Sequence, residues 1–187
     1  MAMQTYTLKI VIGGAGGCGK TTLLHRYMHG LFKEDTTMTI GVSFTSKEVT
    51  RPGARIKLSL WDLGGQNRFR FMQKSYCQGA RAAIVFFDMT RLDTMIQIKD
   101  WVNMFREHVS AQIPIVLAGG KFDLIDEDML ASTNEYAKEM MEQFGLSAYF
   151  MTSSKTGMNV DELFNHVVDV LVCTPSHEKS TAVSSIQ

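Results

Sequence analysis

A glycine-dense segment between a predicted strand and a predicted helix is the feature that most constrains the fold. Residues 13–22 read GGAGGCGKTT, and from Gly14 onward they fit the pattern G-x-x-x-x-G-K-[S/T]. The preceding TLKIVIGG alternates in polarity and ends at glycine, as a strand does, whereas KTTLLHRYMHG places apolar residues at helical spacing up to Gly30. A strand, a phosphate-binding loop and a helix in this order predict an α/β protein with a P-loop.

The residue types in this loop suit phosphate binding. Backbone N–H groups of such a loop converge on phosphate oxygens, and the helix N-terminus adds about half a positive charge. Lys20 is expected to reach the β- and γ-phosphates, and Thr21 to place its hydroxyl on Mg²⁺. A plain glycine-rich turn is the weaker alternative, because the pattern is complete and correctly placed. Cys18 is expected to fill space, although its place at a helix N-terminus could instead lower its pKa and make it redox-sensitive.

Strand and helix signals alternate along the rest of the chain. VSFTSKEVT and RIKLSLWDL, joined by a turn at Pro52 and Gly53, predict an antiparallel hairpin. AAIVFFDMT and IPIVLAGG predict buried strands, SAYFMTSS a weaker one, and amphipathic helices are expected near residues 94–108, 128–144 and 160–172. The pattern predicts a mostly parallel six-stranded sheet with one antiparallel edge strand and helices on both faces. Ligands of such sheets bind beyond the carboxyl ends of the strands.

Length, charge and cysteine content limit the function. The 187 residues suit one domain over residues 1–173, followed by a serine- and threonine-rich segment, 174–187, that is expected to be a disordered tail. Nineteen basic and nineteen acidic residues balance, so nothing general attracts nucleic acid or an anionic membrane. Three separated cysteines, with no export signal and no run of about 18 apolar residues, favour a reduced, cytoplasmic protein, expected to be monomeric.

The phosphate loop alone is compatible with ATPases, kinases and GTPases. A second acidic element is expected in any of them, to help hold the metal ion. The segment WDLGGQ places Asp62 at the end of a strand, where its carboxylate can hold Mg²⁺ through water. The choice among these classes then depends on the remaining strand ends.

Several segments in register resemble the small GTPases of the Ras superfamily, and most of all the Rab group. GGAGGCGKTT resembles the phosphate loop, TIGVSF the stretch after switch I, and KLSLWDLGGQNRF the strand leading into switch II. SYCQGAR, VFFDMT and TSSKTG complete the set, and the resemblance extends from about residue 5 to residue 173. It implies the small G-protein fold and a GTP/GDP molecular switch that hydrolyses GTP with Mg²⁺, in membrane-traffic-like or signalling regulation.

The resemblance also implies catalytic residues. Thr39 is expected to bind Mg²⁺ through its hydroxyl and the γ-phosphate through its N–H, and Gly65 to contact the same phosphate. Gln66 is expected to orient the attacking water. The contacts of Thr39 and Gly65 exist only while the γ-phosphate does, so hydrolysis would release both segments. The implied catalytic set is Gln66, Lys20, Thr39 and Gly65, and the implied metal set is Thr21, Thr39 and, through water, Asp62.

Guanine selectivity is implied by the base-binding segments. Asp123 matches an aspartate that accepts two hydrogen bonds from guanine, a donor pair that adenine lacks. The stem of Lys121 is expected over the base, and Phe32 against its edge, with an ordinary core contact as the alternative for Phe32. The implied nucleotide-binding set is Gly14, Ala15, Gly16, Gly17, Cys18, Gly19, Lys20, Thr21, Thr22, Phe32, Thr39, Gly65, Lys121, Asp123, Ser153, Ser154 and Lys155.

Two departures from the family pattern carry expectations. Gly120 replaces the asparagine of the N-K-x-D motif, a loss expected to cost about 1 to 3 kcal/mol, or roughly 5- to 150-fold in affinity. GDP release is therefore expected to be faster than from a Gly120→Asn variant. Leu63 and Gly64 replace the Thr-Ala pair usual in Rab proteins, and the second glycine is expected to loosen the backbone beside Gly65.

Partners follow from the same resemblance. Phe44, Trp61 and Tyr76 match three aromatic residues that form an effector surface in Rab proteins; the alternative is that at least two of them are core residues. No arginine stands out as an internal finger, so a GTPase-activating protein is expected, together with an exchange factor and an effector. The chain ends in AVSSIQ, so no direct lipid anchor is expected. Two other functions remain open: a guanine-nucleotide scaffold with negligible hydrolysis, and an ATP-dependent phosphotransferase.

Overall fold

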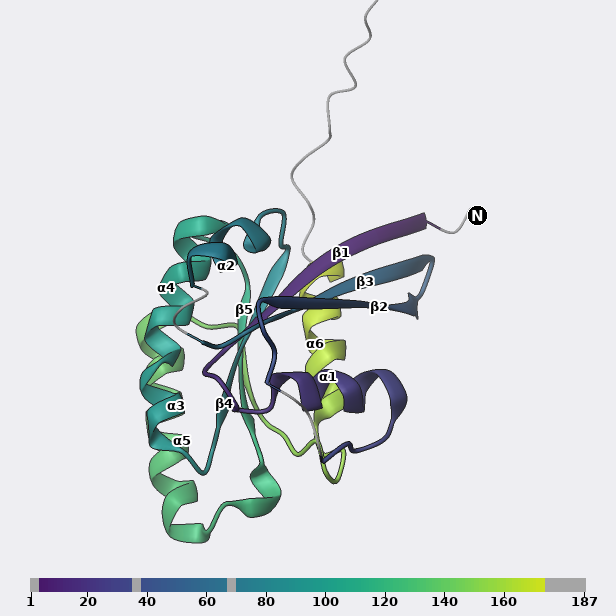
Figure 1. Cartoon of the computed structure of the whole chain (residues 1–187). Helices are drawn as coiled ribbons and strands as arrows, with labels where there is room; N and C mark the ends of the chain where they lie inside the picture. The colour runs from purple at the N-terminus through teal and green to yellow at the C-terminus, as the bar shows by residue number, and fades with distance from the viewer. Residues whose placement is uncertain (1–3, 35–37, 67–69, 174–187) are drawn as a thin grey trace, which may run out of the picture.

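The computed structural model describes residues 4–34, 38–66 and 70–173 of the chain. Its centre is a six-stranded sheet in the order β2-β3-β1-β4-β5-β6 (Figure 1). Neighbouring strands pair in parallel except for β2, at one edge, which runs antiparallel to β3. The predicted sheet is therefore confirmed. Its strands are β1 (Gln4–Gly13), β2 (Val42–Arg51), β3 (Ala54–Leu63), β4 (Ala82–Asp88), β5 (Ile115–Gly120) and β6 (Ala148–Met151).

The burial of each strand reflects its place in the sheet. Residues of β3 alternate between buried and less buried positions over most of the strand, because successive side chains point to opposite faces. The central strands β4 and β5 are buried along their whole length, as expected for parallel strands that are covered on both sides. Their continuous apolar runs in the sequence have this origin.

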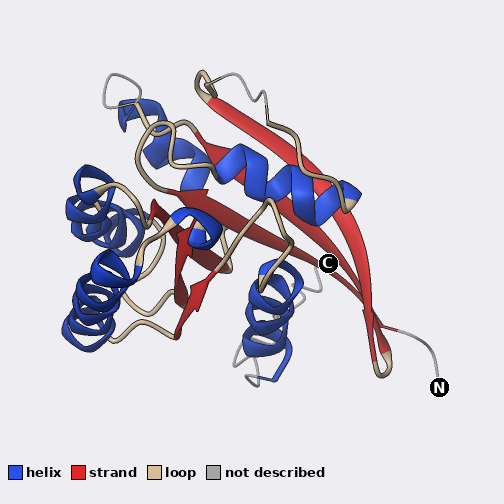
Figure 2. Cartoon of the chain, turned by 90° about the horizontal axis from the view of Figure 1, so that it is seen from below, coloured by secondary structure: helices blue, strands red, loops and turns tan. Residues whose placement is uncertain are grey.

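Helices cover both faces of the sheet, as Figure 2 shows. On one face, α1 and α6 pack on the strands and on each other, and the rings of Tyr27 and Phe164 stack with centroids 3.8 Å apart. On the other face, the larger helices contribute Trp101, Phe105 and Met140 to a second apolar layer. The helices are α1 (Lys20–His29), α2 (Arg70–Cys77), α3 (Leu92–Ile96), α4 (Ile98–His108), α5 (Glu127–Phe144) and α6 (Val160–Cys173), with a short 3₁₀ helix, η2 (Phe122–Leu124).

One helix boundary differs from the prediction. The single helix expected over residues 94–108 is two helices, α3 and α4, which meet at Gln97. The backbone N–H of Gln97 bonds the carbonyl of Met95 rather than one four residues earlier, so the first helix ends there. The hydroxyl of Thr94 accepts from the N–H of Asp88 at 3.0 Å and thereby ties α3 to the end of β4. Periodicity alone does not reveal this bond between a strand end and a helix.

The parallel strands bring separate loops to one edge of the sheet. The carboxyl ends of β1, β3, β4, β5 and β6 lie there, because parallel strands end at the same edge. The phosphate loop follows β1, and the two predicted base-binding loops follow β5 and β6. In the described part of the chain, no helix has the length and apolar character needed to span a bilayer. The tail expected at 174–187 lies outside the described residues.

Candidate functional site

A cavity of about 410 Å³ opens at the carboxyl edge of the sheet. Every member of the predicted nucleotide-binding set lines it except Gly14, Ala15 and Ser153. Those three lie directly behind the wall, where each bonds a residue that does line it: Lys20 in two cases and Asp123 in the third. The lining is Gly16, Gly17, Cys18, Gly19, Lys20, Thr21, Thr22, Phe32, Glu34, Met38, Thr39, Gly65, Phe86, Lys121, Asp123, Leu124, Ser154 and Lys155.

Two glycines of the phosphate loop have backbone conformations that another residue would adopt only with strain. Gly19, which precedes α1, has φ +108°, a backbone conformation that favours glycine. Gly14 has φ +149°, and a Cβ there would lie 2.0 Å from the carbonyl oxygen of Phe86. The loop therefore lies against β4, with its backbone N–H groups at the start of α1.

Lys20 is the cation at the centre of the loop. Its side chain is almost entirely buried, and Nζ donates to the carbonyl oxygens of Gly14 and Ala15, both at 2.8 Å. Cys18 lies next to it, fully buried, with Sγ 3.7 Å from Nζ of Lys20. Burial raises the pKa of the Cys18 thiol, which favours the space-filling interpretation over a reactive thiolate.

Two hydroxyls and one carboxylate form an oxygen-rich cluster beside the loop. Oγ1 of Thr21 lies 2.7 Å from Oγ1 of Thr39 and also donates to Oδ2 of Asp62. Oγ1 of Thr39 donates to the same Oδ2 at 3.2 Å. Asp62 is 1% exposed, burial raises its pKa, and its Oδ1 has no hydrogen-bond partner in the described part of the chain.

This cluster fits a hard divalent cation. Mg²⁺ prefers oxygen ligands, keeps several waters and typically takes one or two carboxylates plus substrate phosphate. A buried carboxylate oxygen without a partner is costly, so a cation or a water bound to one would stabilise Asp62. Among the described residues, no group of three or more His, Cys, Asp or Glu could hold a metal ion. A cation here would therefore depend on hydroxyls, water and phosphate.

The two predicted switch segments meet over the phosphate loop. A Cβ at Gly65 would lie 2.3 Å from the backbone of Ala15 and Gly16, and one at Gly64 would lie 2.7 Å from the carbonyl oxygen of Thr39. Gly64 also donates its N–H to the carbonyl of Gly41 at 2.8 Å. The second glycine thus permits close packing between the segments, and its expected effect on backbone freedom stays a prediction.

Gln66 makes a further contact between the two predicted switch segments. Its Nε2 lies 2.8 Å from Sδ of Met38, the residue before Thr39. Met38 itself is 58% exposed and lines the cavity. The predicted water-orienting residue therefore contacts the residue before Thr39, but it does not itself line the cavity.

At the predicted base-binding end of the cavity, polar contacts join the segments that follow β5 and β6. Oδ1 of Asp123 accepts from the hydroxyl of Ser153 at 2.5 Å, and the N–H of Phe122 donates to the carbonyl of Thr152 at 3.0 Å. Asp123 is exposed to the cavity mouth. Phe32 is 39% exposed and lines the cavity, which rules out the alternative that it is an ordinary core residue.

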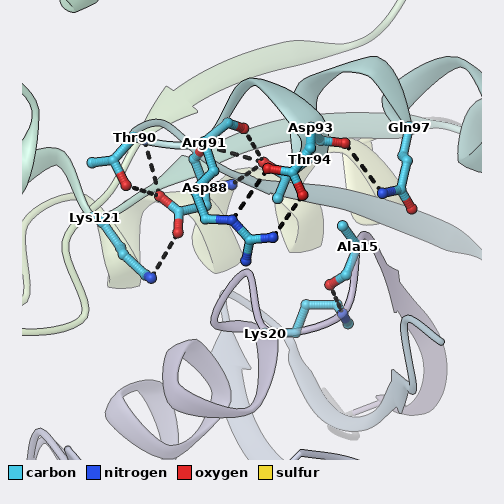
Figure 3. A network of polar contacts seen from close by, with 9 residues as sticks. All are labelled: Ala15, Lys20, Asp88, Thr90, Arg91, Asp93, Thr94, Gln97 and Lys121. Carbon is cyan, nitrogen blue, oxygen red and sulfur yellow. Dashed lines mark hydrogen bonds and ion pairs between the residues drawn. The ribbon is translucent and has the colours of Figure 1, made fainter.

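Polar residues at the end of β4 and in the segments after β4 and β5 form ion pairs that the sequence analysis did not predict. Nζ of Lys121 lies 2.6 Å from Oδ2 of the fully buried Asp88 (Figure 3). Arg91 pairs with Asp93 at 2.6 Å, and its Nη1 would lie 3.6 Å from a Cβ at Gly17. Asp88 could have been found, since it ends a strand at the ligand-binding edge. Nothing in the sequence indicates in which direction the Arg91 side chain points.

The three predicted surface aromatics form one cluster. Phe44 is 71% exposed and Tyr76 40%, so the alternative that two of the three are core residues is wrong. The Phe44 and Trp61 rings stack with centroids 5.5 Å apart, and those of Trp61 and Tyr76 lie 6.0 Å apart. An exposed, contiguous aromatic group suits contact with another protein.

Comparison with known proteins agrees with this geometry. The model of the Ras family matches residues 9–172. Ras-related protein Rab-19 of Rattus norvegicus is 34% identical over 85% of this chain and 72% of its own length, and GTP-binding protein ypt4 of Schizosaccharomyces pombe is 33% identical over 89% and 72%. GTP-binding protein YPT53 of Saccharomyces cerevisiae is 34% identical over 98% and 84%. The chain therefore belongs to the Ras family and is a small GTPase most similar to the Rab and Ypt proteins.

Proposed function

We propose that this chain binds GTP and GDP in the 410 Å³ cavity and hydrolyses GTP to GDP and phosphate in the presence of Mg²⁺. The observation that carries the proposal is that the two ends of the cavity differ in their chemistry. Lys20 and the hydroxyl–carboxylate cluster lie at one end, and Asp123 with Ser153 lies at the other. A phosphate chain and a base with two donors match these two ends.

The phosphate end supplies charge and position. Lys20, held by two loop carbonyls, would neutralise β- and γ-phosphate oxygens, while the loop N–H groups and the start of α1 would cradle the chain. Thr21 and Thr39 would contribute hydroxyl ligands to Mg²⁺, and Asp62 would accept from its water shell. When bound, Mg²⁺ would neutralise the charge that develops between the β- and γ-phosphates.

The base end supplies selectivity. The hydroxyl of Ser153 fixes one oxygen of the Asp123 carboxylate, so that the group faces guanine in one orientation. Guanine N1–H and its amine can donate to this carboxylate, whereas adenine would leave it unpaired. The N–H groups of Ser154 and Lys155, which line the same end, would approach the base oxygen.

Hydrolysis would depend on the two segments over the phosphate loop. Gln66 would orient the attacking water, and the N–H groups of Thr39 and Gly65 would hold the γ-phosphate. Loss of that phosphate would remove both contacts and free the segments, which is the switch. The aromatic cluster of Phe44, Trp61 and Tyr76 adjoins these two segments. An effector would bind this cluster in membrane-traffic-like or signalling regulation.

Regulators and domain limits belong to the same proposal. An activating protein could supply an arginine worth about 10³- to 10⁵-fold in rate, and an exchange factor would accelerate GDP release. We further propose that residues 1–173 form the GTPase domain and that the protein acts in the cytoplasm as a monomer.

The test combines binding and a single turnover. We expect the purified protein to retain guanine nucleotide and to exclude ATP in competition, and we expect Asp123→Ala to lose this selectivity. A single-turnover assay should release phosphate slowly from the parent, and at least about tenfold more slowly from Gln66→Leu. Glu135→Leu, on the exposed side of α5, is the control and should match the parent. Equal rates for parent and Gln66→Leu would favour the scaffold, and tighter binding of ATP would favour the phosphotransferase.

A further inference from the structure

Phe86 on β4 occupies the space that a side chain at position 120 would need. Phe86 of β4 is paired with Ala118 of β5. Gly120 lies two residues beyond Ala118 and therefore on the same face of the sheet. A Cβ at Gly120 would lie 2.2 Å from Cζ of Phe86 and 2.7 Å from its Cε1. Real Cβ atoms do not approach other heavy atoms this closely. The Phe86 ring and a side chain at position 120 therefore cannot occupy their places at the same time.

The same residue also touches the phosphate loop. Cε1 of Phe86 would lie 3.6 Å from a Cβ at Gly19, an ordinary van der Waals distance. The carbonyl oxygen of Phe86 accepts from Sγ of Cys18 at 3.5 Å. Phe86 is only 1% exposed, yet it lines the cavity, so its ring lies between the phosphate loop and the end of β5.

The ring has little freedom to move away. It belongs to the apolar layer on the α1 and α6 face, in one cluster with Cys18, Leu23 and Phe164. A close-packed interior resists added volume, because displaced side chains must leave favourable rotamers. A side chain added at 120 would therefore push Phe86 against the phosphate loop or its neighbours in this layer.

We propose that Phe86 and Gly120 are a matched pair. Their apolar packing holds the phosphate loop against the predicted base-binding loop that follows β5, and it thereby sets the rate of GDP release. Phe86 is a positioning residue here, because it acts through the two loops. The inference rests on the proposed function, since it concerns guanine nucleotide in the same cavity. It also corrects the expectation for Gly120→Asn: that variant alone should release GDP faster than the parent, because the asparagine and the ring cannot both fit.

A double-mutant cycle tests the pair. The proteins are the parent, Phe86→Val, Gly120→Asn and the double variant, and the readouts are the dissociation rate of fluorescent GDP and the melting temperature. We expect each single change to accelerate release by at least about fivefold, through lost or excess packing. The double variant should release GDP more slowly than either single variant, because the valine leaves room for the asparagine.

The neighbouring phenylalanine gives a matched control. Phe87 is the same residue type on the same strand and is equally buried, but it packs in the layer on the opposite face and does not line the cavity. Phe87→Val combined with Gly120→Asn should give the product of the two single effects. Gly120→Ala adds only the Cβ, so it tests the same contact if the asparagine variant does not fold.

The outcomes separate the two proposals. Slower release from Gly120→Asn alone, or simple multiplication of the Phe86→Val and Gly120→Asn effects, would overturn the matched pair. Failure of the parent to bind guanine nucleotide at all would overturn the proposed function instead.

Discussion

At the scale of single residues, the buried carboxylate of Asp62 is central to the predicted metal site. Asp62 is 1% exposed, and Oδ2 accepts from two threonine hydroxyls while Oδ1 has no hydrogen-bond partner among the described residues. Burial raises the pKa of this carboxyl, so its ionised form is costly unless a positive charge compensates it. Lys20 supplies part of that charge, and a cation bound beside the hydroxyls would supply more.

The Asp62→Asn variant measures that compensation. In the parent, removal of Mg²⁺ with a chelator should accelerate GDP release by about 10- to 100-fold, the value of a lost charge-assisted contact. In Asp62→Asn, release should already be fast and should change little on chelation. Asp128→Asn, exposed on α5, should behave as the parent does. An Asp62→Asn protein that still responds fully to the chelator would show that this carboxylate does not support the metal.

At the scale of elements, the sequence predicts what local chemistry determines. The hairpin follows from alternation and a Pro-Gly turn, and α1 begins after Gly19 and ends before Gly30, whose left-handed backbone caps it. The break between α3 and α4 was not predicted, because the apolar spacing continues through Gln97, where the backbone N–H bonds the carbonyl of Met95 instead of continuing the helix. The extent of β1 toward Gln4 was also missed, because pairing with β3, rather than its own pattern, holds that end.

The first turn of α5 offers a local test of this distinction. Asp126 precedes the helix, and its Oδ1 accepts from the N–H of Met129 at 2.7 Å, so it caps an otherwise unpaired donor. Asp126→Ala should lower the free energy of unfolding by about 1 kcal/mol, measured by denaturant titration. Glu135→Ala, at an exposed mid-helix position, should change it by less than about 0.5 kcal/mol. Equal effects at the two positions would mean that the cap contributes nothing.

At the scale of the whole molecule, the topology assembles the site. The phosphate loop, Asp62 and Asp123 were predicted from motifs, since each lies at or just after the end of a strand at the same edge. The contributions of Phe86, Asp88 and Arg91 were not, because they depend on strand register and side-chain direction across separate elements. The motif thus locates the ligand, whereas packing between strands determines how firmly it is held.

Because one cavity draws on segments from both halves of the chain, a ligand bound there should stabilise the entire fold. Lys20 lies near its beginning and Lys155 near its end, so unfolding of either half would destroy the site. GDP with Mg²⁺ at about 100 times its Kd should add about 2.7 kcal/mol to nucleotide-stripped protein and raise its melting temperature by roughly 5–10 °C. Asp123→Ala should lose most of this shift, whereas Asp128→Ala should keep it. A shift of the same size with ADP would show that stabilisation comes from the phosphate end alone, and that Asp123 does not select guanine.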